Sequence, residues 1–267
     1  MKEIKKFWTF VRERETIRVR RERGDKPPFT EDERLMNYWF PNIRRSDDPA
    51  TVWLHAALLR HLDKPQDLVE ASVAFRLFGG WVPTGELLAP IWYGSGYWEA
   101  GFLEALGGVE KPSNPHVPRQ LRTQSLAAAA ASLEAVHAAD GFVHLLRGAT
   151  LQEAHRALSR PRGIGPEMAY EVVCDLRRTK VLEAAPDRLS WALPSVSAVK
   201  GASLLLDREL GPARRGDQQE TIETMQRILE EGREEFPDWE LSEAQRALSM
   251  FHTWASWPKP ARRKRWK

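Results

Sequence analysis

A short turn built from two glycines lies between two amphipathic segments and constrains the fold more than any other feature of the sequence. The turn is Gly163-Ile164-Gly165, followed directly by Pro166. Glycine permits a positive φ and the close approach of another backbone, and proline suits the first turn of a helix. Ile164 is expected to fix the turn in the core, and Ala169 leaves room for close helix packing. The pattern predicts a helical hairpin over residues 158–178.

Helical periodicity also dominates the rest of the sequence, and no stretch shows the alternation of apolar and polar residues that is typical of a strand. Capping residues, glycines and prolines predict further helices near 4–24, 30–39, 49–62, 66–78, 84–92, 96–106, 120–139, 150–159, 195–207, 217–235 and 241–255. We therefore expect an all-α fold, with one helical domain over 1–257 and a basic C-terminal tail over 258–267. The domain is expected to be either undivided or built from two lobes that flank a cleft.

Basic residues collect at the two ends of the chain. The net charge is only +3, yet the pI is about 9.0, and arginines and lysines are frequent in residues 12–23 and 259–267. Clustered positive charge favours a nucleic-acid partner. The C-terminal tail is expected to act either as a flexible arm that binds phosphates or as a disordered segment that aids solubility.

The single cysteine, Cys174, excludes several kinds of site. A disulfide framework, a cysteine-built zinc site and an iron–sulfur cluster each need more thiols. The seven histidines show no ligand spacing, so we expect no catalytic metal and no cofactor. No apolar run approaches the length of a membrane span, and no signal-peptide core follows Met1. We therefore expect a cytoplasmic protein with no membrane partner.

The predicted hairpin resembles the helix-hairpin-helix, a clamp on the DNA backbone that reads no sequence. Backbone amides at a helix N-terminus point outward and favour a phosphate. The predicted DNA-backbone contacts are Arg162, Gly163, Ile164 and Gly165. A monovalent cation held by carbonyls of the hairpin is a further expectation. The alternative interpretation is a plain packing unit of two helices.

An aspartate follows the hairpin at a spacing similar to that in helix-hairpin-helix DNA glycosylases, where it lies at the mouth of the base pocket. Asp187 comes 22 residues after Gly165. Glu167 stands where the bifunctional glycosylases carry a lysine, which argues against a Schiff-base mechanism. The alternative role for Asp187 is a helix N-cap, for which the Pro-Asp pair is suited.

The first 55 residues contain the most distinctive motifs. Glu13-Arg14-x-x-Ile17 follows several aromatic residues, and a Gly24…Pro28-Phe29-Thr30-x-Asp32 stretch comes next. A third motif contains Phe40, Asn42, Arg45, Asp48 and Thr51. Together these motifs resemble the alpha-glutamyl/putrescinyl thymine pyrophosphorylase family, whose members are themselves similar to helix-hairpin-helix glycosylases. The chain departs from that family in residues 191–201, which lack its glycine-rich run.

The resemblance implies a fold like that of the helix-hairpin-helix DNA glycosylases and a reaction on DNA in a phage-infected bacterial host. Its implied substrate is a 5-(pyrophosphoryloxymethyl)uracil base in double-stranded DNA, made with the help of a DNA 5-hydroxymethyluracil kinase as functional partner. A small amine, either an amino acid or putrescine, would displace the pyrophosphate. The base must leave the duplex to be reached.

The resemblance, with the chemistry of that reaction, selects the candidate site residues. A carboxylate is needed to take the proton of the attacking amine, and the candidates are Glu13, Asp48 and Asp187. Groups expected to bind the substrate or its pyrophosphate are Arg14, Arg45, Asn42 and Thr51. Aromatic rings expected to stack on the base are Trp39, Phe40 and Trp191. Two structural alternatives are an Arg45–Asp48 pair and a solvated helix face that contains Glu13 and Arg14.

Two other functions are compatible with the same residues. A DNA glycosylase that excises a modified or damaged base would use the hairpin and Asp187, but it leaves the arginine-rich N-terminal block unexplained. A non-catalytic module that binds modified DNA for another enzyme would need the hairpin without the carboxylate.

Overall fold

The computed structural model describes residues 3–37, 40–77, 86, 131–132, 135–136, 148–212 and 214–257. Every regular element in these ranges is helical, which confirms the all-α fold. The helices expected near 84–92, 96–106 and 120–139 and the tail at 258–267 lie almost entirely outside the described residues. Within the described part, no helix combines the length and apolar character that a membrane span needs.

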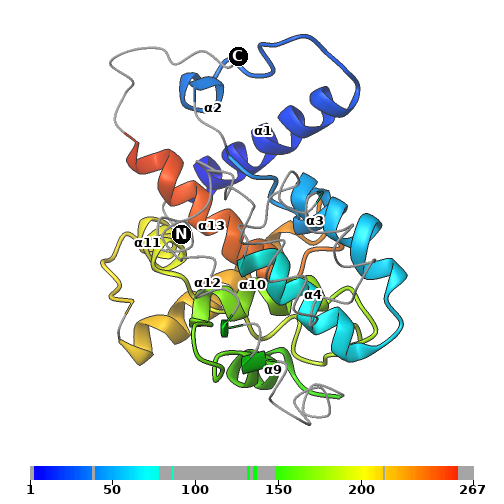
Figure 1. Cartoon of the computed structure of the whole chain (residues 1–267). Coiled ribbons are helices and arrows are strands. Elements are labelled where there is room, and N and C mark those ends of the chain that lie inside the picture. The colour runs from blue at the N-terminus through cyan, green and yellow to red at the C-terminus, as the bar shows by residue number, and fades with distance from the viewer. Residues whose placement is uncertain are drawn as a thin grey trace. The chain divides into compact units, whose positions relative to one another are not determined.

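The chain forms two compact units, whose helices carry their labels in Figure 1. Unit 1 consists of residues Met1–Asp48 and Arg188–Lys267, and unit 2 consists of Pro49–Asp187. The described helices of unit 1 are α1 (Ile4–Glu22), α2 (Glu33–Asn37), a 3-10 turn (Arg45–Asp47), α11 (Val196–Leu206), α12 (Arg215–Gly232) and α13 (Leu241–Ser256). Those of unit 2 are α3 (Pro49–Trp53), a π-helical turn (Leu54–Leu58), a 3-10 turn (Leu59–His61), α4 (Pro65–Leu77), α9 (Leu151–Leu158) and α10 (Pro166–Leu176).

An aromatic cluster packs α1 against the C-terminal helices of unit 1. The indole of Trp8 stacks on Phe236, with 6.0 Å between ring centroids, and the Phe7 ring meets Phe251 edge to face at 5.4 Å. The indole nitrogen of Trp8 also donates a hydrogen bond to Glu231 at 3.3 Å. Rings of this size remove a large apolar area from water, so this cluster joins the first and last parts of the chain into one core.

Helix α2 begins at Glu33, three residues later than predicted, whereas α13 begins at Leu241 as predicted. Thr30 does not cap α2, because its hydroxyl accepts the Asp32 amide, while the Asp32 carboxylate accepts the amides of Arg34 and Leu35 at 2.8 and 3.0 Å. The capping box of α13 uses Glu240 and Glu243. In both places a nearby carboxylate takes the capping position.

Unit 2 contains the predicted hairpin. Its first helix, α9, has a capping box in which Thr150 and Glu153 exchange hydrogen bonds, and its second, α10, begins at Pro166. Helix α4 packs against α10, where the Arg76 guanidinium binds the buried Asp175 carboxylate through Nε at 2.7 Å. The two opposite charges form an ion pair in the core of unit 2.

Helices α11 and α13 approach each other closely at Gly201, and this contact generates a stability prediction. A Cβ at Gly201 would lie 2.3 Å from the backbone oxygen of Leu248. We expect Gly201→Ala to lower the free energy of unfolding by about 3 kcal/mol, the upper part of the range for overpacked cores. The measurement is urea unfolding followed by circular dichroism.

The matched control is Gly216→Ala in α12. Nothing lies within 4 Å of the position that a Cβ would occupy there, so alanine should stabilise the helix by about 0.5–1 kcal/mol. Equal unfolding midpoints for the two variants would contradict the close packing of α11 on α13.

Candidate functional site

Residues 40–48 of the third N-terminal motif form a folded loop in unit 1. Asn42 donates from Nδ2 to the backbone oxygen of Asp47 at 2.6 Å, and the Ser46 hydroxyl donates to the Asp47 carboxylate at 3.0 Å. The 3-10 turn begins at Arg45 and ends at Asp47. Asn42 thus closes the loop by binding its backbone, which gives the motif a structural role.

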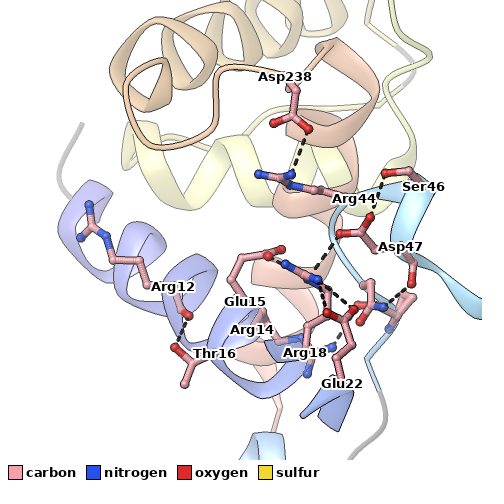
Figure 2. A network of polar contacts seen from close by, with 12 residues as sticks. Arg12, Arg14, Glu15, Thr16, Arg18, Glu22, Arg44, Ser46, Asp47 and Asp238 are labelled. Atoms are coloured by element: carbon pink, nitrogen blue, oxygen red, sulfur yellow. Dashed lines mark hydrogen bonds and ion pairs between the residues drawn. The ribbon is translucent and has the colours of Figure 1, made fainter. Parts of the chain in front are cut away.

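Charged groups hold this loop against α1 (Figure 2). The Arg18 guanidinium lies among three carboxylates, those of Glu15 at 3.0 Å, Glu22 at 2.7 Å and Asp47 at 3.3 Å. Arg44 lies apart from this group and pairs with Asp238 at 2.9 Å. The three carboxylates compensate the Arg18 charge and link the loop to the helix.

Arg14 is almost completely buried, with 3% of its surface exposed. Its Nη2 donates to the carbonyl oxygens of Phe40 at 2.7 Å and Pro41 at 3.1 Å, and the guanidinium lies 5.7 Å from the Phe40 ring. No carboxylate pairs with Arg14 in the described part of the chain, and its Nε has no hydrogen-bond partner there. The interpretation of Arg14 as part of a solvated helix face is therefore wrong.

Burial lowers the pKa of Arg14 to about 10, and the charges of Arg21 and Arg246 act in the same direction. A shift of this size corresponds to about 3 kcal/mol of folding free energy lost while the group is charged. Because the folded pKa lies below the unfolded one, the penalty is complete below pH 10 and fades as the pH rises towards the ordinary pKa of an arginine. An anion bound beside Arg14 would reduce this penalty.

The other candidates of the N-terminal block differ in their surroundings. Asp48 pairs with Arg246 at 3.1 Å, and its amide donates to the Arg45 carbonyl at 3.2 Å; the alternative of an Arg45–Asp48 side-chain pair stays a prediction. The Arg45 side chain is 6% exposed. Glu13 is half-buried, and its carboxylate forms no hydrogen bond or ion pair with a described residue. Thr51 is buried in α3 of unit 2.

The aromatic rings that are expected to stack on a base differ in their burial. The Phe40 ring is buried against Phe10, with 6.1 Å between centroids, so its role in stacking on a base stays a prediction that requires this contact to open. Trp191 is half-buried in unit 1. Trp39 lies outside the described residues.

The turn of the hairpin presents open backbone to solvent. Gly163 has a φ of +89°, Ile164 is buried, and a Cβ at Gly165 would meet nothing within 4 Å. No side chain caps the N-terminus of α10, and Arg162 is exposed. The predicted anchoring by Ile164 is confirmed, and the amides at the start of α10 are positioned to face an anion.

A histidine links the two helices of the hairpin. Nε2 of His155 in α9 donates to the Pro166 carbonyl in α10 at 2.9 Å, which requires the proton to be on Nε2 because a carbonyl only accepts. Burial lowers the pKa of His155, against the opposing effect of this hydrogen bond. The described residues contain no group of three His, Cys, Asp or Glu side chains that could hold a metal ion.

Asp187 caps a helix, but one that precedes it in the chain. Its Oδ1 accepts the Leu151 amide at 2.7 Å and its Oδ2 accepts the Gln152 amide at 3.1 Å. Both oxygens are thus oriented by the N-terminus of α9, where a carboxylate is favoured. A carboxylate oxygen can accept more than one hydrogen bond, so the cap leaves the predicted catalytic role open to test.

A family model matches the N-terminal third of the chain. Residues 2–89 match the model described as 5-hmdU DNA kinase, helical domain. The matched segment contains α1, the loop at 40–48 and α4. No curated protein and no solved structure matches the chain. The match covers Glu13, Arg14, Asn42, Arg45, Asp48 and Thr51, so these candidates belong to the part of the chain that is similar to that family.

Sequence reasoning missed the residues that hold the candidate groups in place. Arg246, the partner of Asp48, lies 198 residues further along the chain, and no spacing rule connects the two. The pair of Arg18 with Asp47 was also missed, because an arginine in a charge-rich helix indicates a solvated face. His155 had a local signal, since it lies eight residues before Gly163 on the helix that leads into the turn.

The Asp48–Arg246 pair generates a prediction that concerns the loop. Both side chains are mostly buried, so Arg246→Met should leave the Asp48 carboxylate without its partner and lower the free energy of unfolding by about 1–3 kcal/mol. The matched control is Arg12→Met, which removes an exposed pair with Glu235 and should cost less than about 1 kcal/mol. Urea unfolding of both variants makes the comparison, and equal losses would contradict the assignment.

Proposed function

We propose that the chain modifies a pyrimidine base in DNA by displacing pyrophosphate from 5-(pyrophosphoryloxymethyl)uracil with an amine. The observation that supports this most is the match of residues 2–89 to the helical domain of 5-hmdU DNA kinase. That name concerns 5-hydroxymethyl-2′-deoxyuridine in DNA. A phosphorylated hydroxymethyl group is an activated carbon centre, and the proposed reaction would consume it.

The proposed reaction exchanges one bond for another at the methylene carbon. The lone pair of the neutral amine forms a carbon–nitrogen bond, and the carbon–oxygen bond to pyrophosphate breaks with its electron pair leaving on oxygen. The nitrogen then loses a proton to a carboxylate. Guanidinium groups near the leaving oxygen stabilise the charge that develops there.

The surroundings of the candidate residues indicate which of them suit proton transfer and which suit pyrophosphate binding. Glu13 is the candidate proton acceptor with no partner among the described side chains, whereas Asp48 is paired with Arg246 and Asp187 is bound to α9. Arg14 and Arg45 are covered, so pyrophosphate would reach them only if residues 40–48 move. The buried, uncompensated charge of Arg14 favours such an exchange of partners.

The hairpin in unit 2 is the proposed contact with the DNA backbone. The turn of Gly163, Ile164 and Gly165 would lie against the phosphates, and Arg162 would bring a positive charge to them. The Ile164 amide already donates to the Pro161 carbonyl at 3.2 Å, so Ile164 would hold the turn in place. A monovalent cation at the hairpin remains part of this proposal. Contacts of this kind hold the duplex in register without reading its sequence.

The same family match favours a second candidate function. A helical domain of a kinase could present modified DNA to a separate catalytic site, and the 267 residues contain no G-x-x-x-x-G-K-[ST] run for binding nucleotide phosphates. On this interpretation the chain would bind modified DNA without changing it.

Mass spectrometry of nucleosides distinguishes amine transfer from the binding of modified DNA without reaction. Phosphorylated 5-hydroxymethyluracil DNA is incubated with the protein and a mixture of amines, and then digested. We expect a thymidine whose methylene carries the amine, together with free pyrophosphate. Unchanged nucleosides would favour the binding module, and an abasic site with free base would favour a DNA glycosylase.

The variant Asp187→Asn tests a role in catalysis separately from the cap. Asparagine keeps one acceptor oxygen for the α9 amides, so the fold should persist, while a catalytic carboxylate should cost about 100-fold or more in rate. The matched control is Asp32→Asn, which alters the cap of α2. Equal rates for the two variants would remove Asp187 from the mechanism and leave Glu13→Gln as the next test.

The hairpin contact predicts a loss of DNA affinity without a loss of stability. Gly165 has a φ of −77° and open space at its Cβ position, so Gly165→Ala should fold normally, while the added methyl group would lie where a phosphate must approach. We expect duplex affinity, measured by fluorescence anisotropy, to fall about tenfold. Gly216→Ala is the control, and an unchanged affinity for Gly165→Ala would argue for a plain packing hairpin.

A further inference from the structure

Arg246 lies near the buried Arg14, although the two residues come from opposite ends of the chain. Arg14 is on α1 and Arg246 is on α13, and both helices belong to unit 1. Burial lowers the pKa of Arg14, and the charges of Arg21 and Arg246 lower it further. Like charges in a mostly buried place repel each other, so this arrangement costs folding free energy that an anion would recover.

The two guanidiniums bind opposite ends of the same loop. Nη2 of Arg14 donates to the carbonyl oxygens of Phe40 and Pro41, where the loop begins. Nη2 of Arg246 donates to the Asp48 carboxylate, where the loop ends, at 3.1 Å. Nε of Arg14 is buried and has no partner among the described residues. The oxygens of the loop therefore satisfy only part of the hydrogen-bonding capacity of Arg14.

Carboxylates are available nearby, but they gather on a different arginine of α1. Arg18, one turn after Arg14, lies among the carboxylates of Glu15, Glu22 and Asp47. The negative charge of Glu15 favours the charged form of Arg14, yet its carboxylate accepts a hydrogen bond from Arg18. Arg14 is thus a buried guanidinium beside a second one, without a described carboxylate of its own, and such a pair suits an anion with several oxygens.

We propose that Arg14 and Arg246 together bind the pyrophosphate group of the substrate, and that the Asp48 carboxylate occupies this site until pyrophosphate displaces it. The inference rests on the proposed function, which makes pyrophosphate the leaving group. It adds a residue of α13, outside the family match at 2–89. It also gives Asp48 the role of a competing anion in place of that of a proton acceptor.

The exchange of anions needs movement at one end of the loop only. The preceding part of the loop is held independently of Asp48, because Arg18 pairs with Asp47 at 3.3 Å and Asn42 donates to the Asp47 carbonyl. The Asp48 carboxylate therefore leaves Arg246 while the loop keeps its fold. Nε of Arg14 is the donor for the incoming anion, so the carbonyl contacts through Nη2 persist.

The experiment measures the binding of inorganic pyrophosphate in the absence of DNA, by isothermal titration calorimetry on the full chain. The variants are Asp48→Asn and Arg246→Met. The matched control for the first is Asp47→Asn, which removes the neighbouring carboxylate of the same loop. The matched control for the second is Arg12→Met, which removes an exposed arginine. Affinity for an unmodified duplex and amine transfer are measured in parallel.

We expect Asp48→Asn to bind pyrophosphate about tenfold more tightly than the unaltered chain, because the competitor for Arg246 is removed. Arg246→Met should bind it about tenfold more weakly, because a charge-assisted contact is lost. Both controls should stay within about twofold of the unaltered chain. Misfolding cannot produce a gain of affinity, so Asp48→Asn keeps the test decisive even if Arg246→Met fails to fold.

Three results would overturn the inference. Equal gains from Asp48→Asn and Asp47→Asn would show a general effect of charge. A gain for the unmodified duplex but not for pyrophosphate would assign the two guanidiniums to the phosphates of the DNA backbone. A lack of pyrophosphate binding by both the unaltered chain and Asp48→Asn would show that no such site exists.

The assay of amine transfer separates this inference from the proposed function. Amine transfer by the unaltered chain, with the same pyrophosphate affinity in Asp48→Asn, would remove the inference and leave the proposed function standing. Pyrophosphate binding with the expected changes in both variants, but without amine transfer, would support the anion site and remove the proposed reaction.

Discussion

The conformation of the N-terminal motif depends on one buried cation. Arg14 donates to two successive carbonyls of the loop at 40–48 and does so without a carboxylate to balance its charge in the described part of the chain. Burial without such a partner is unfavourable, and it lowers the pKa of Arg14. The loop therefore packs on the Arg14 guanidinium, whose positive charge an anion would neutralise and carbonyl oxygens do not.

Two further ion pairs attach this loop to helices α1 and α13. Arg18 connects it to α1 through Asp47, and Arg246 connects its end to α13 through Asp48. These pairs explain why polar residues recur through the motif without any of them being a solvated surface group. In unit 2, the hairpin depends on different physics, namely a positive φ at Gly163 and the burial of Ile164.

Local features were predictable from the sequence, and long-range pairs were not. Thr150, the hairpin glycines and Pro166 act within a few residues of themselves, so their structure follows from short-range rules. The partner of Asp48 lies 198 residues away, and Asp187 binds amides 36 and 35 residues earlier. Such pairings are set by packing of whole helices. The start of α2 was misjudged because two capping residues, Thr30 and Asp32, compete for one helix, and a carboxylate satisfies two amides where a hydroxyl satisfies one.

The aromatic contact between α1 and the C-terminal helices has a consequence for synthesis on the ribosome. Trp8 and its partner Glu231 are 223 residues apart, and translation proceeds at about 5–20 residues per second. The aromatic side chains of α1 therefore stay uncovered on the order of tens of seconds, until the C-terminal part of unit 1 that packs against them has been synthesised. During that time a nascent chain exposes the kind of side chains that bind chaperones, and unit 2 is complete before unit 1 is closed.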